Sequence, residues 1–162
     1  MTEPLLRVED LVVTLGTRSG DHDIVHGISL QVQPGETLGV VGESGSGKTL
    51  TMLAVMRLLS HPLVMRQGSI HLEGEDLTAL SDAQMRGVRG RKVAMVYQDP
   101  MTSLNPLMRV GDQIVEAMTA HGVDGDEARR RALETMARVE LPDPERTSRA
   151  YPHELSGGMR QR

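Results

Sequence analysis

The sequence has 162 residues, enough for about one domain with a substantial hydrophobic core. Its 18 basic and 22 acidic residues give a net charge of -4, so it lacks the basic field typical of a nucleic-acid-binding protein, and we expect no nucleic-acid partner. It contains no cysteine, which excludes disulfides and thiolate metal sites and is compatible with a reducing compartment such as the cytoplasm.

The N-terminal residues predict an antiparallel pair of strands. Leu5–Leu15 and Asp23–Val32 alternate apolar and polar residues, and the polar stretch Gly16–Gly20 between them predicts a loop. The opening residues MTEPLLRVED are acidic and lack the basic start and apolar core of a signal peptide. No apolar run approaches the roughly 18 residues that a membrane span requires, so we expect no direct membrane insertion.

A glycine-rich loop between a strand and a helix is the strongest signal in the sequence. Glu36–Val41 is a short apolar run typical of a buried parallel strand, and Lys48–Ser60 is apolar nearly all round, which predicts a buried helix. Between them the residues GESGSGKT, Gly42–Thr49, match the phosphate-loop pattern G-x-x-x-x-G-K-[ST].

Glycines in such a loop let successive backbone amides point into one concavity, and the helix N-terminus adds partial positive charge. We predict that Lys48 reaches the β- and γ-phosphates of ATP and that the hydroxyl of Thr49 binds Mg²⁺. The residues predicted to bind ATP here are Gly42, Glu43, Ser44, Gly45, Ser46, Gly47, Lys48 and Thr49. The alternative is a glycine-rich turn that precedes Lys-Thr by chance, and the predicted strand and helix on either side favour the nucleotide site.

The middle of the chain predicts short strands, a helix and a loop. Gly68–Glu73 and Lys92–Tyr97 predict strands, and Ser81 with Gln84 three residues later forms a capping box before a short helix. The segment QDPMTSLNP, residues Gln98–Pro106, contains two prolines and several turn formers, so it predicts a loop.

Helices predominate in the last third of the sequence. Val110–Ala120 and Asp126–Glu140 predict helices, and Pro142 and Pro144 end the second. The charges of this second helix, including Arg129–Arg131, are more typical of a solvated face than of a binding patch.

The last residues, ELSGGMRQR, predict the start of a helix. Ser156 can cap it, and Gly157 and Gly158 would let a ligand approach the backbone, although serine-glycine pairs on their own usually form a flexible turn. The six histidines are dispersed, and His153-Glu154 lacks the second histidine of a zinc-protease helix. We therefore predict no metal other than Mg²⁺.

Three motifs in a fixed order resemble the nucleotide-binding subunit of ATP-binding cassette (ABC) transporters over the whole chain. They are the phosphate loop, Gln98 at the end of a predicted strand, and LSGG at the start of a helix. More narrowly, VYQDPMTSLNP and YPHELSGGMRQR are similar to the importer branch for dipeptides, oligopeptides and nickel. The PDPERTSRAYPHELSGGMRQR ending resembles the first of its two paired ATPase subunits.

This resemblance implies a fold class and a division of the chain. The class is an α/β phosphate-loop NTPase of the ABC cassette type, with an N-terminal antiparallel β subdomain, a helical subdomain and an incomplete core sheet. The antiparallel β region would cover residues 1–35, a portion of the phosphate-loop core 36–98, and the glutamine loop and helical subdomain up to the signature motif 99–162.

The resemblance also implies roles for individual residues. Lys48 and Gln98 would be catalytic, and Thr49 and Gln98 would bind Mg²⁺. The γ-phosphate of ATP held by a second ATPase subunit would be bound by Ser156, Gly157 and Gly158. The loop Asp99–Met108 would dock on membrane permease subunits. The protein would then be a peripheral ATPase subunit on the cytoplasmic face of the membrane, coupling ATP binding and hydrolysis to uptake of peptides or related solutes.

The sequence departs from the family pattern at two points. Leu15 stands where many relatives carry an aromatic residue that stacks on adenine, and such stacking is worth roughly 1 to 3 kcal/mol in nucleic-acid complexes. The catalytic glutamate that polarises the attacking water and the switch histidine follow the signature helix in the family, and the chain ends before both. The resemblance thus implies a truncated cassette that does not hydrolyse ATP alone.

Two other functions stay open at this stage. One is a nucleotide-binding or interaction module that holds ATP without turnover, favoured by the absent carboxylates and by Leu15. The other is a different phosphate-loop enzyme, such as a small-molecule kinase, in which LSGG would be coincidental. Because an incomplete sheet leaves apolar edges open, we expect these 162 residues expressed alone to be insoluble or molten.

Overall fold

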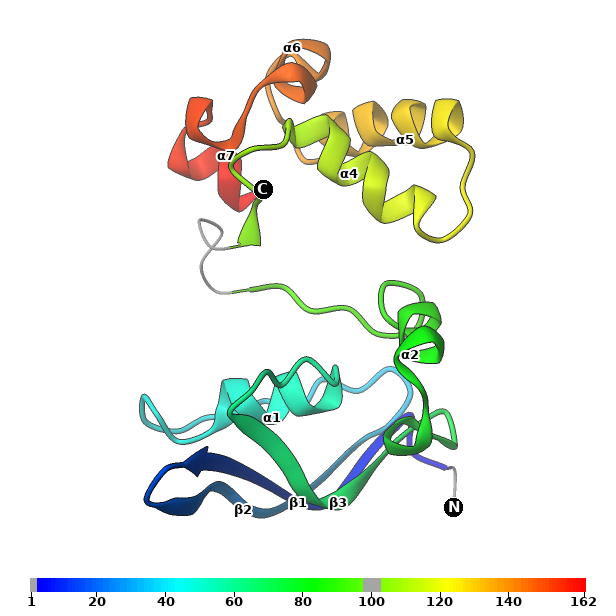
Figure 1. The fold of residues 1–162 in the computed structure, drawn as a ribbon. Helices are drawn as coiled ribbons and strands as arrows, with labels where there is room; N and C mark the ends of the chain where they lie inside the picture. Colours follow the sequence, from blue (N-terminus) through cyan, green and yellow to red (C-terminus); the bar gives the residue numbers. More distant parts are fainter. Residues whose placement is uncertain (1–2, 98–102) are drawn as a thin grey trace. The chain divides into compact units, whose positions relative to one another are not determined.

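The computed structural model describes residues 3–97 and 103–162. The predicted loop residues 98–102, which include Gln98, lie outside the described residues. The chain forms two compact units, Met1–Ala94 and Met95–Arg162, each of which has its own hydrophobic core (Figure 1). Among the described helices, none has the length and apolar character that crossing a bilayer would require.

The first unit is built on an antiparallel sheet. Its strands are β1 (Leu6–Thr17), β2 (Gly20–Val32), β3 (Leu63–Leu72) and β4 (Glu75–Asp76), in the spatial order β2-β1-β3-β4. The predicted N-terminal hairpin is confirmed, although β1 and β2 pair as far as Thr17 and Gly20, so the turn is shorter than the predicted loop. The third strand starts five residues before the predicted one.

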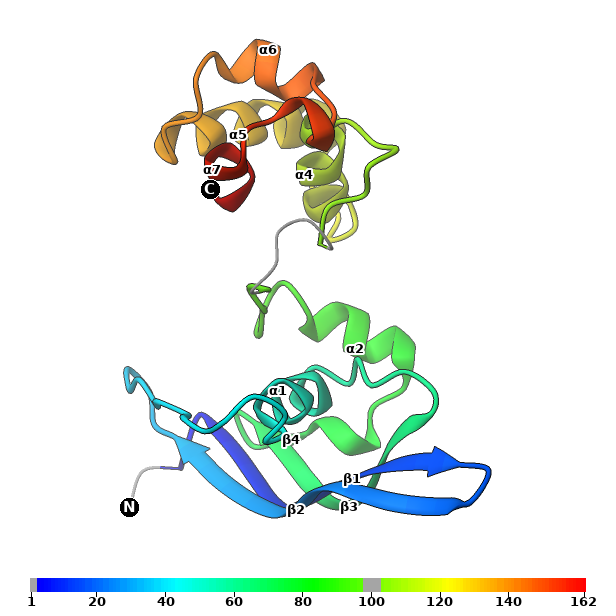
Figure 2. The same ribbon diagram turned by 90° about the vertical axis from the view of Figure 1, so that its left-hand side faces the viewer.

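Helix α1 covers one face of this sheet. Figure 2 shows α1 (Lys48–Val55) lying across the strands, and its residues Ala54 and Val55 belong to the same buried core as Leu11 and Ile70. The core is completed from the turn η1 (Leu77–Ala79) and the helix α2 (Asp82–Val88), which contribute Leu77, Met85 and Val88. The predicted capping box is confirmed, since Ser81 Oγ accepts from Gln84 N and Gln84 Oε1 accepts from Ser81 N.

Two predicted strands and one helix end are wrong. Residues 36–41 and 94–97 have no regular secondary structure and pair with no strand among the described residues, and Val93 makes only an isolated bridge to Arg89. A parallel strand depends on neighbouring strands for its hydrogen bonds, and residues 3–97 and 103–162 supply none at either segment. The helix predicted to reach Ser60 ends at Val55 because Arg57 adopts a left-handed conformation (φ 50). The fully buried residues of α1, which are Thr51, Ala54 and Val55, lie on one side of the helix.

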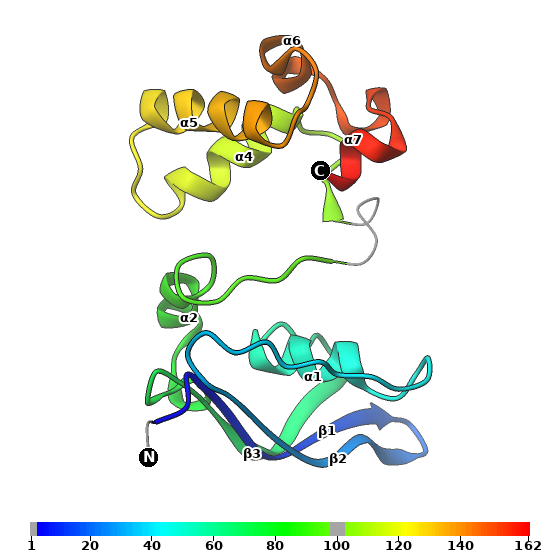
Figure 3. The ribbon, with the colours of Figure 1, turned by 180° about the vertical axis from the view of Figure 1, so that it is seen from behind.

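The second unit is helical. Its elements are α4 (Val110–Thr119), α5 (Gly125–Arg138), α6 (Pro144–Arg149), the turn η2 (Pro152–Glu154) and α7 (Gly157–Gln161). Figure 3 shows α4 and α5 alongside each other, with α6 and α7 near one end of the pair. The unit's small core consists of Val110, Met136, Leu141 and Leu155.

The helices predicted over 110–120 and 126–140 are confirmed to within two residues at each end. Pro144 has a different role from the predicted one, because it occupies the first turn of α6 rather than only ending the preceding helix. Proline is well suited to that position, where its missing N–H would have had no partner within the helix. Asp143 caps α6 by accepting a hydrogen bond from Arg146 N at 3.2 Å.

Candidate functional site

The glycine-rich loop lies between residues 36–41 and the N-terminus of α1. Gly45 (φ 83) and Gly47 (φ 89) both adopt positive φ, a conformation that favours glycine, and Gly47 is the N-cap of the helix. The loop closes on itself through a hydrogen bond from Ser46 N to Glu43 O at 3.2 Å. The predicted glycine-rich loop opening directly into a helix is therefore present, without the predicted strand before it.

Lys48 lies inside the curve of this loop. Its Nζ donates to Gly42 O at 2.8 Å, to Glu43 O at 2.7 Å and to Ser46 Oγ at 3.2 Å. These contacts hold an ammonium group within the concavity that the loop encloses. An ammonium group surrounded by loop backbone at a helix N-terminus suits anionic oxygens. Such oxygens interact with the ammonium charge and accept hydrogen bonds from backbone amides.

Close packing fixes the shape of the loop. A Cβ atom at Gly42 would lie 2.7 Å from Ser46 Oγ, and a Cβ atom at Gly47 would lie 3.1 Å from Val25 Cγ2 of strand β2. The buried hydroxyl of Thr51 donates to Gly47 O at 3.0 Å, and Thr51 N donates to the same oxygen at 2.8 Å. The sheet and the first turn of α1 thus set the curvature of the loop.

Thr49, which follows Lys48 in the first turn of α1, offers an exposed hydroxyl. It is solvent-exposed, and its side chain makes no hydrogen bond within the described residues. Among those residues, no group of three or more His, Cys, Asp or Glu side chains could hold a metal ion by itself. A hydroxyl that contributes one ligand, with phosphate oxygens and water supplying the others, is the usual way in which proteins bind Mg²⁺ beside a nucleotide. The residues present fit that arrangement.

The second candidate segment lies at the start of α7. Ser156 Oγ accepts from Met159 N at 3.3 Å, which confirms the predicted N-cap, and Leu155 before it is buried. Gly157 and Gly158 are exposed, and a Cβ atom at either position would meet no atom within 4 Å. This leaves the backbone of both glycines open to a ligand.

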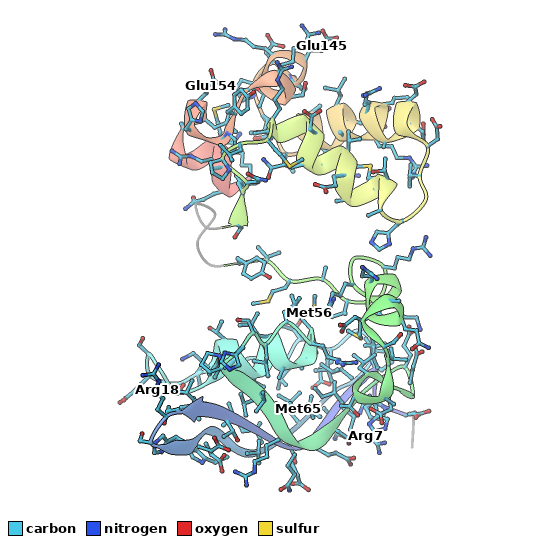
Figure 4. All side chains as sticks on the ribbon, in the orientation of Figure 1. Arg7, Arg18, Met56, Met65, Glu145 and Glu154 are labelled. Carbon is cyan, nitrogen blue, oxygen red and sulfur yellow. The ribbon has the colours of Figure 1, made fainter. Side chains whose placement is uncertain are left out.

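A short ordered turn precedes α7. Figure 4 labels Glu154 in this turn, where its Oε2 accepts from Tyr151 N at 2.7 Å. The rings of Tyr151 and His153 stack with their centroids 5.7 Å apart. This turn is not among the elements predicted above, although the spacing of three residues between Tyr151 and the capping Glu154 is a signal for it in the sequence.

The position of Leu15 is also established. It pairs with His22 of β2 on one side and with Leu63 of β3 on the other, and it is half-buried near the end of the sheet.

The predicted site residues within the described part of the chain form two groups. The start of α1 brings together Lys48, the loop glycines and Thr49, and the start of α7 brings together Ser156, Gly157 and Gly158.

Comparisons with known proteins agree with this architecture. Residues 25–162 match the sequence profile of a family described as ABC transporter. The dimeric structure of MJ0796, a bacterial ABC transporter cassette, is similar at a TM-score of 0.81 over 96% of this chain and 65% of that one, with 23% sequence identity. A second structure of the same cassette, bound to ADP and Pi after hydrolysis, has a TM-score of 0.78. The predicted fold class is therefore confirmed.

Several curated proteins are more similar in sequence. The oligopeptide transport ATP-binding protein OppD of Bacillus subtilis (strain 168) is 45% identical over 160 residues, which are 98% of this chain and 45% of that protein. The putative peptide import ATP-binding protein BAB2_1052 of Brucella abortus (strain 2308) is 45% identical over 162 residues, 99% of this chain and 49% of that protein. The chain thus spans about half the length of the curated relatives it matches.

Proposed function

This chain belongs to the ABC transporter family, and we propose that it is the ATP-binding part of an importer for peptides or related solutes. The observation that carries the proposal is the loop of Gly42–Thr49 enclosing the Lys48 ammonium at the N-terminus of α1. The names of the two curated relatives, an oligopeptide transport and a putative peptide import ATP-binding protein, support the choice of solute.

The loop residues would bind the triphosphate of ATP. Gly45 and Gly47, with their positive φ, turn the backbone so that the amides of Gly45–Thr49 can face one anion. Lys48 would exchange its contacts with the two loop carbonyls for the β- and γ-phosphate oxygens, a replacement of neutral acceptors by charged ones. The gain in that exchange favours the bound state.

The exposed hydroxyl of Thr49, together with Gln98, would contribute to the Mg²⁺ site. Bound Mg²⁺ neutralises charge on the β- and γ-phosphates, which is the usual contribution of this ion to phosphoryl transfer. Lys48 places a second positive charge at the same phosphates. We assign Lys48 and Gln98 as the catalytic residues of this chain in ATP hydrolysis by the whole protein.

The start of α7 would bind a second nucleotide. We assign Ser156, Gly157 and Gly158 to the γ-phosphate of ATP held by a second ATPase subunit, identical to this chain or related to it. Support comes from the exposure of the glycines and from the Ser156 cap, which fixes their backbone at the beginning of a helix. The ATP would then lie between two subunits.

The membrane partner would be a pair of permease subunits that contact the loop 99–108. The chain would in that case lie at the cytoplasmic face of the membrane as a peripheral subunit. The alternative function is a module that binds ATP at the same loop but does not hydrolyse it.

The test is a titration of the full chain, carrying a solubility tag, with ATP in the presence and absence of MgCl₂. We expect Mg²⁺-dependent binding that Lys48→Ala weakens by about tenfold or more, since hydrogen bonds between charged groups contribute roughly 1.5 to 3 kcal/mol. Thr49→Ala should reduce the dependence on Mg²⁺. The matched control is Lys92→Ala, which removes the other lysine of the sequence, one that pairs with Glu73 and Glu75.

Equal weakening of ATP binding by Lys48→Ala and Lys92→Ala would contradict the proposed nucleotide site. The absence of Mg²⁺-dependent ATP binding would also contradict it. Steady-state ATP turnover that Lys48→Ala abolishes would in turn reject the non-hydrolysing alternative.

A further inference from the structure

A pocket lined by three arginines lies in the helical unit, apart from the residues assigned to ATP. Its volume is about 210 Å³, and Arg109, Arg129 and Arg149 contribute its positive charge. Its apolar lining comes from Val115, Ala132 and Leu133. We call it the arginine pocket. Helices α4, α5 and α6 all contribute to it, so its shape is set by their packing.

The backbone holds two of these arginines near each other. Val110 N donates to Ala150 O at 2.9 Å, and these two residues directly follow Arg109 and Arg149. The helices meet closely at this point, because a Cβ atom at Gly111 would lie 2.8 Å from Ser148 Cβ. The fold thus brings the backbone of the two arginines together, and both side chains line the same pocket.

The charges of the pocket are poorly neutralised. Arg109 and Arg149 form no ion pair within the residues that the structure describes, and Arg129 lies 3.4 Å from an Asp126 side chain that is 96% exposed. The one carboxylate that lines the pocket belongs to Asp112. Like charges held together cost free energy, and a bound anion would relieve that cost.

Neighbouring arginines of the same unit show the opposite pattern. On α5, Arg130 lies 2.7 Å from Glu127, and Arg131 and Arg130 each contact a glutamate four residues away, Glu127 and Glu134 respectively, at 2.5 Å. These side chains form a solvated network of ion pairs, as the sequence predicted for this face. In the part of the chain that the structure describes, Arg109 and Arg149 have no such carboxylate partners, so their charges are available to a ligand in the pocket.

We propose that the arginine pocket binds a glutamate-bearing segment of a partner protein. The carboxylate would accept hydrogen bonds from Arg109 and Arg149, whose planar guanidinium groups match its geometry. The aliphatic stem of glutamate would contact the apolar side chains of Val115 and Leu133. Asp112 favours a singly charged carboxylate over a doubly charged phosphate, because its own negative charge repels the second charge more strongly.

The test uses the full chain with a solubility tag and a fluorescently labelled hexaglutamate peptide, with hexaglutamine as the uncharged probe. We expect hexaglutamate to bind and hexaglutamine to bind far more weakly, measured by fluorescence anisotropy at low and high salt. Arg149→Gln and Arg109→Gln should each weaken hexaglutamate binding by about fivefold, as expected for removal of one exposed ion pair.

The control is Arg146→Gln, a change of the same charge on the same helix at an exposed residue that does not line the pocket. Equal weakening by Arg146→Gln would mean a general charge effect and would overturn the proposal. Binding of inorganic phosphate that Arg149→Gln abolishes, with no binding of hexaglutamate, would overturn the assignment to a carboxylate. An unchanged helical circular dichroism signal shows that the second unit of Arg149→Gln is folded, and unchanged ATP binding by this variant separates the outcome from the proposed nucleotide site.

Discussion

Gly47, the N-cap of α1, packs against Val25 of strand β2 so closely that a Cβ atom at Gly47 would lie 3.1 Å from Val25 Cγ2. Gly47 is also buried and has a φ of 89, which an L-amino acid with a side chain adopts only at a cost. The glycine therefore serves two needs. It lets the loop turn into the helix, and it lets the loop lie against the sheet.

We predict that Gly47→Ala destabilises the first unit by about 1 to 3 kcal/mol, the sum of a left-handed alanine and a tight contact with Val25. Gly87→Ala is the control, because Gly87 lies in α2 and a Cβ atom there would meet no atom within 4 Å. That change should stabilise the unit by about 0.5 to 1 kcal/mol. Proteolysis across a urea series measures the free energy of unfolding of both variants. Equal effects of the two changes would contradict the packing argument.

The sequence predicts the structure correctly where residues close in sequence determine it. The hairpin of β1 and β2 follows from alternation, and the cap at Ser81 follows from its spacing to Gln84. The glycine-rich loop that opens α1 follows from its glycines and Lys48, because a tight turn before a helix restricts the residues that can form it. In each case the interacting residues are close in sequence or follow a regular repeat.

Features that depend on distant residues were missed. The run 36–41 has the composition of a strand, but a strand forms only with a partner, and none of the described residues pairs with it. The arginine pocket was missed because Arg109, Arg129 and Arg149 are about 20 residues apart in sequence, and only the packing of α4, α5 and α6 brings them together. The local charge pattern groups Arg129 with Arg130 and Arg131, which pair with Glu127 on the same helix.

Arg89 joins two elements of the first unit. Its Nε donates to Met56 O at 2.8 Å and its Nη2 donates to Arg57 O at 2.7 Å, so a residue that follows α2 satisfies carbonyls at the end of α1. We predict that Arg89→Ala costs about 1 to 3 kcal/mol, because both acceptors would lose a charged donor. Arg86→Ala, at an exposed position on α2, should change stability by about 0.5 kcal/mol or less. Urea unfolding compares the variants, and similar values for both would reject this role of Arg89.

Glu127 gives the helical unit a dependence on pH. Hydrogen bonds from Arg130 and then from Arg131 lower the pKa of Glu127 from 4.5 to about 2. Because the folded state has the lower pKa, this contribution to stability is fully present above the unfolded pKa of 4.5 and is lost as pH falls towards 2.

We predict that Glu127→Gln destabilises the protein near neutral pH and that the difference from the unmodified chain shrinks steadily between pH 5 and pH 2. Urea unfolding at several pH values measures the difference, in which the titration of other acidic groups cancels. High salt should reduce the difference, since all of these side chains are at least partly exposed. A difference that stays constant from neutral to acidic pH would show that the carboxylate's charge contributes nothing.

Val41 and Val96 are exposed valines in segments without a strand partner among the described residues. Val41 is 94% exposed and Val96 is 97% exposed. Unpaired apolar segments of this kind pair readily with other chains. We predict that Val41→Lys and Val96→Glu each raise the soluble fraction and lower the thioflavin T signal. Leu107→Lys is the matched control, since Leu107 is 85% exposed but lies in a loop beside α4. An equal gain from Leu107→Lys would attribute aggregation to surface hydrophobicity in general and not to the unpaired segments.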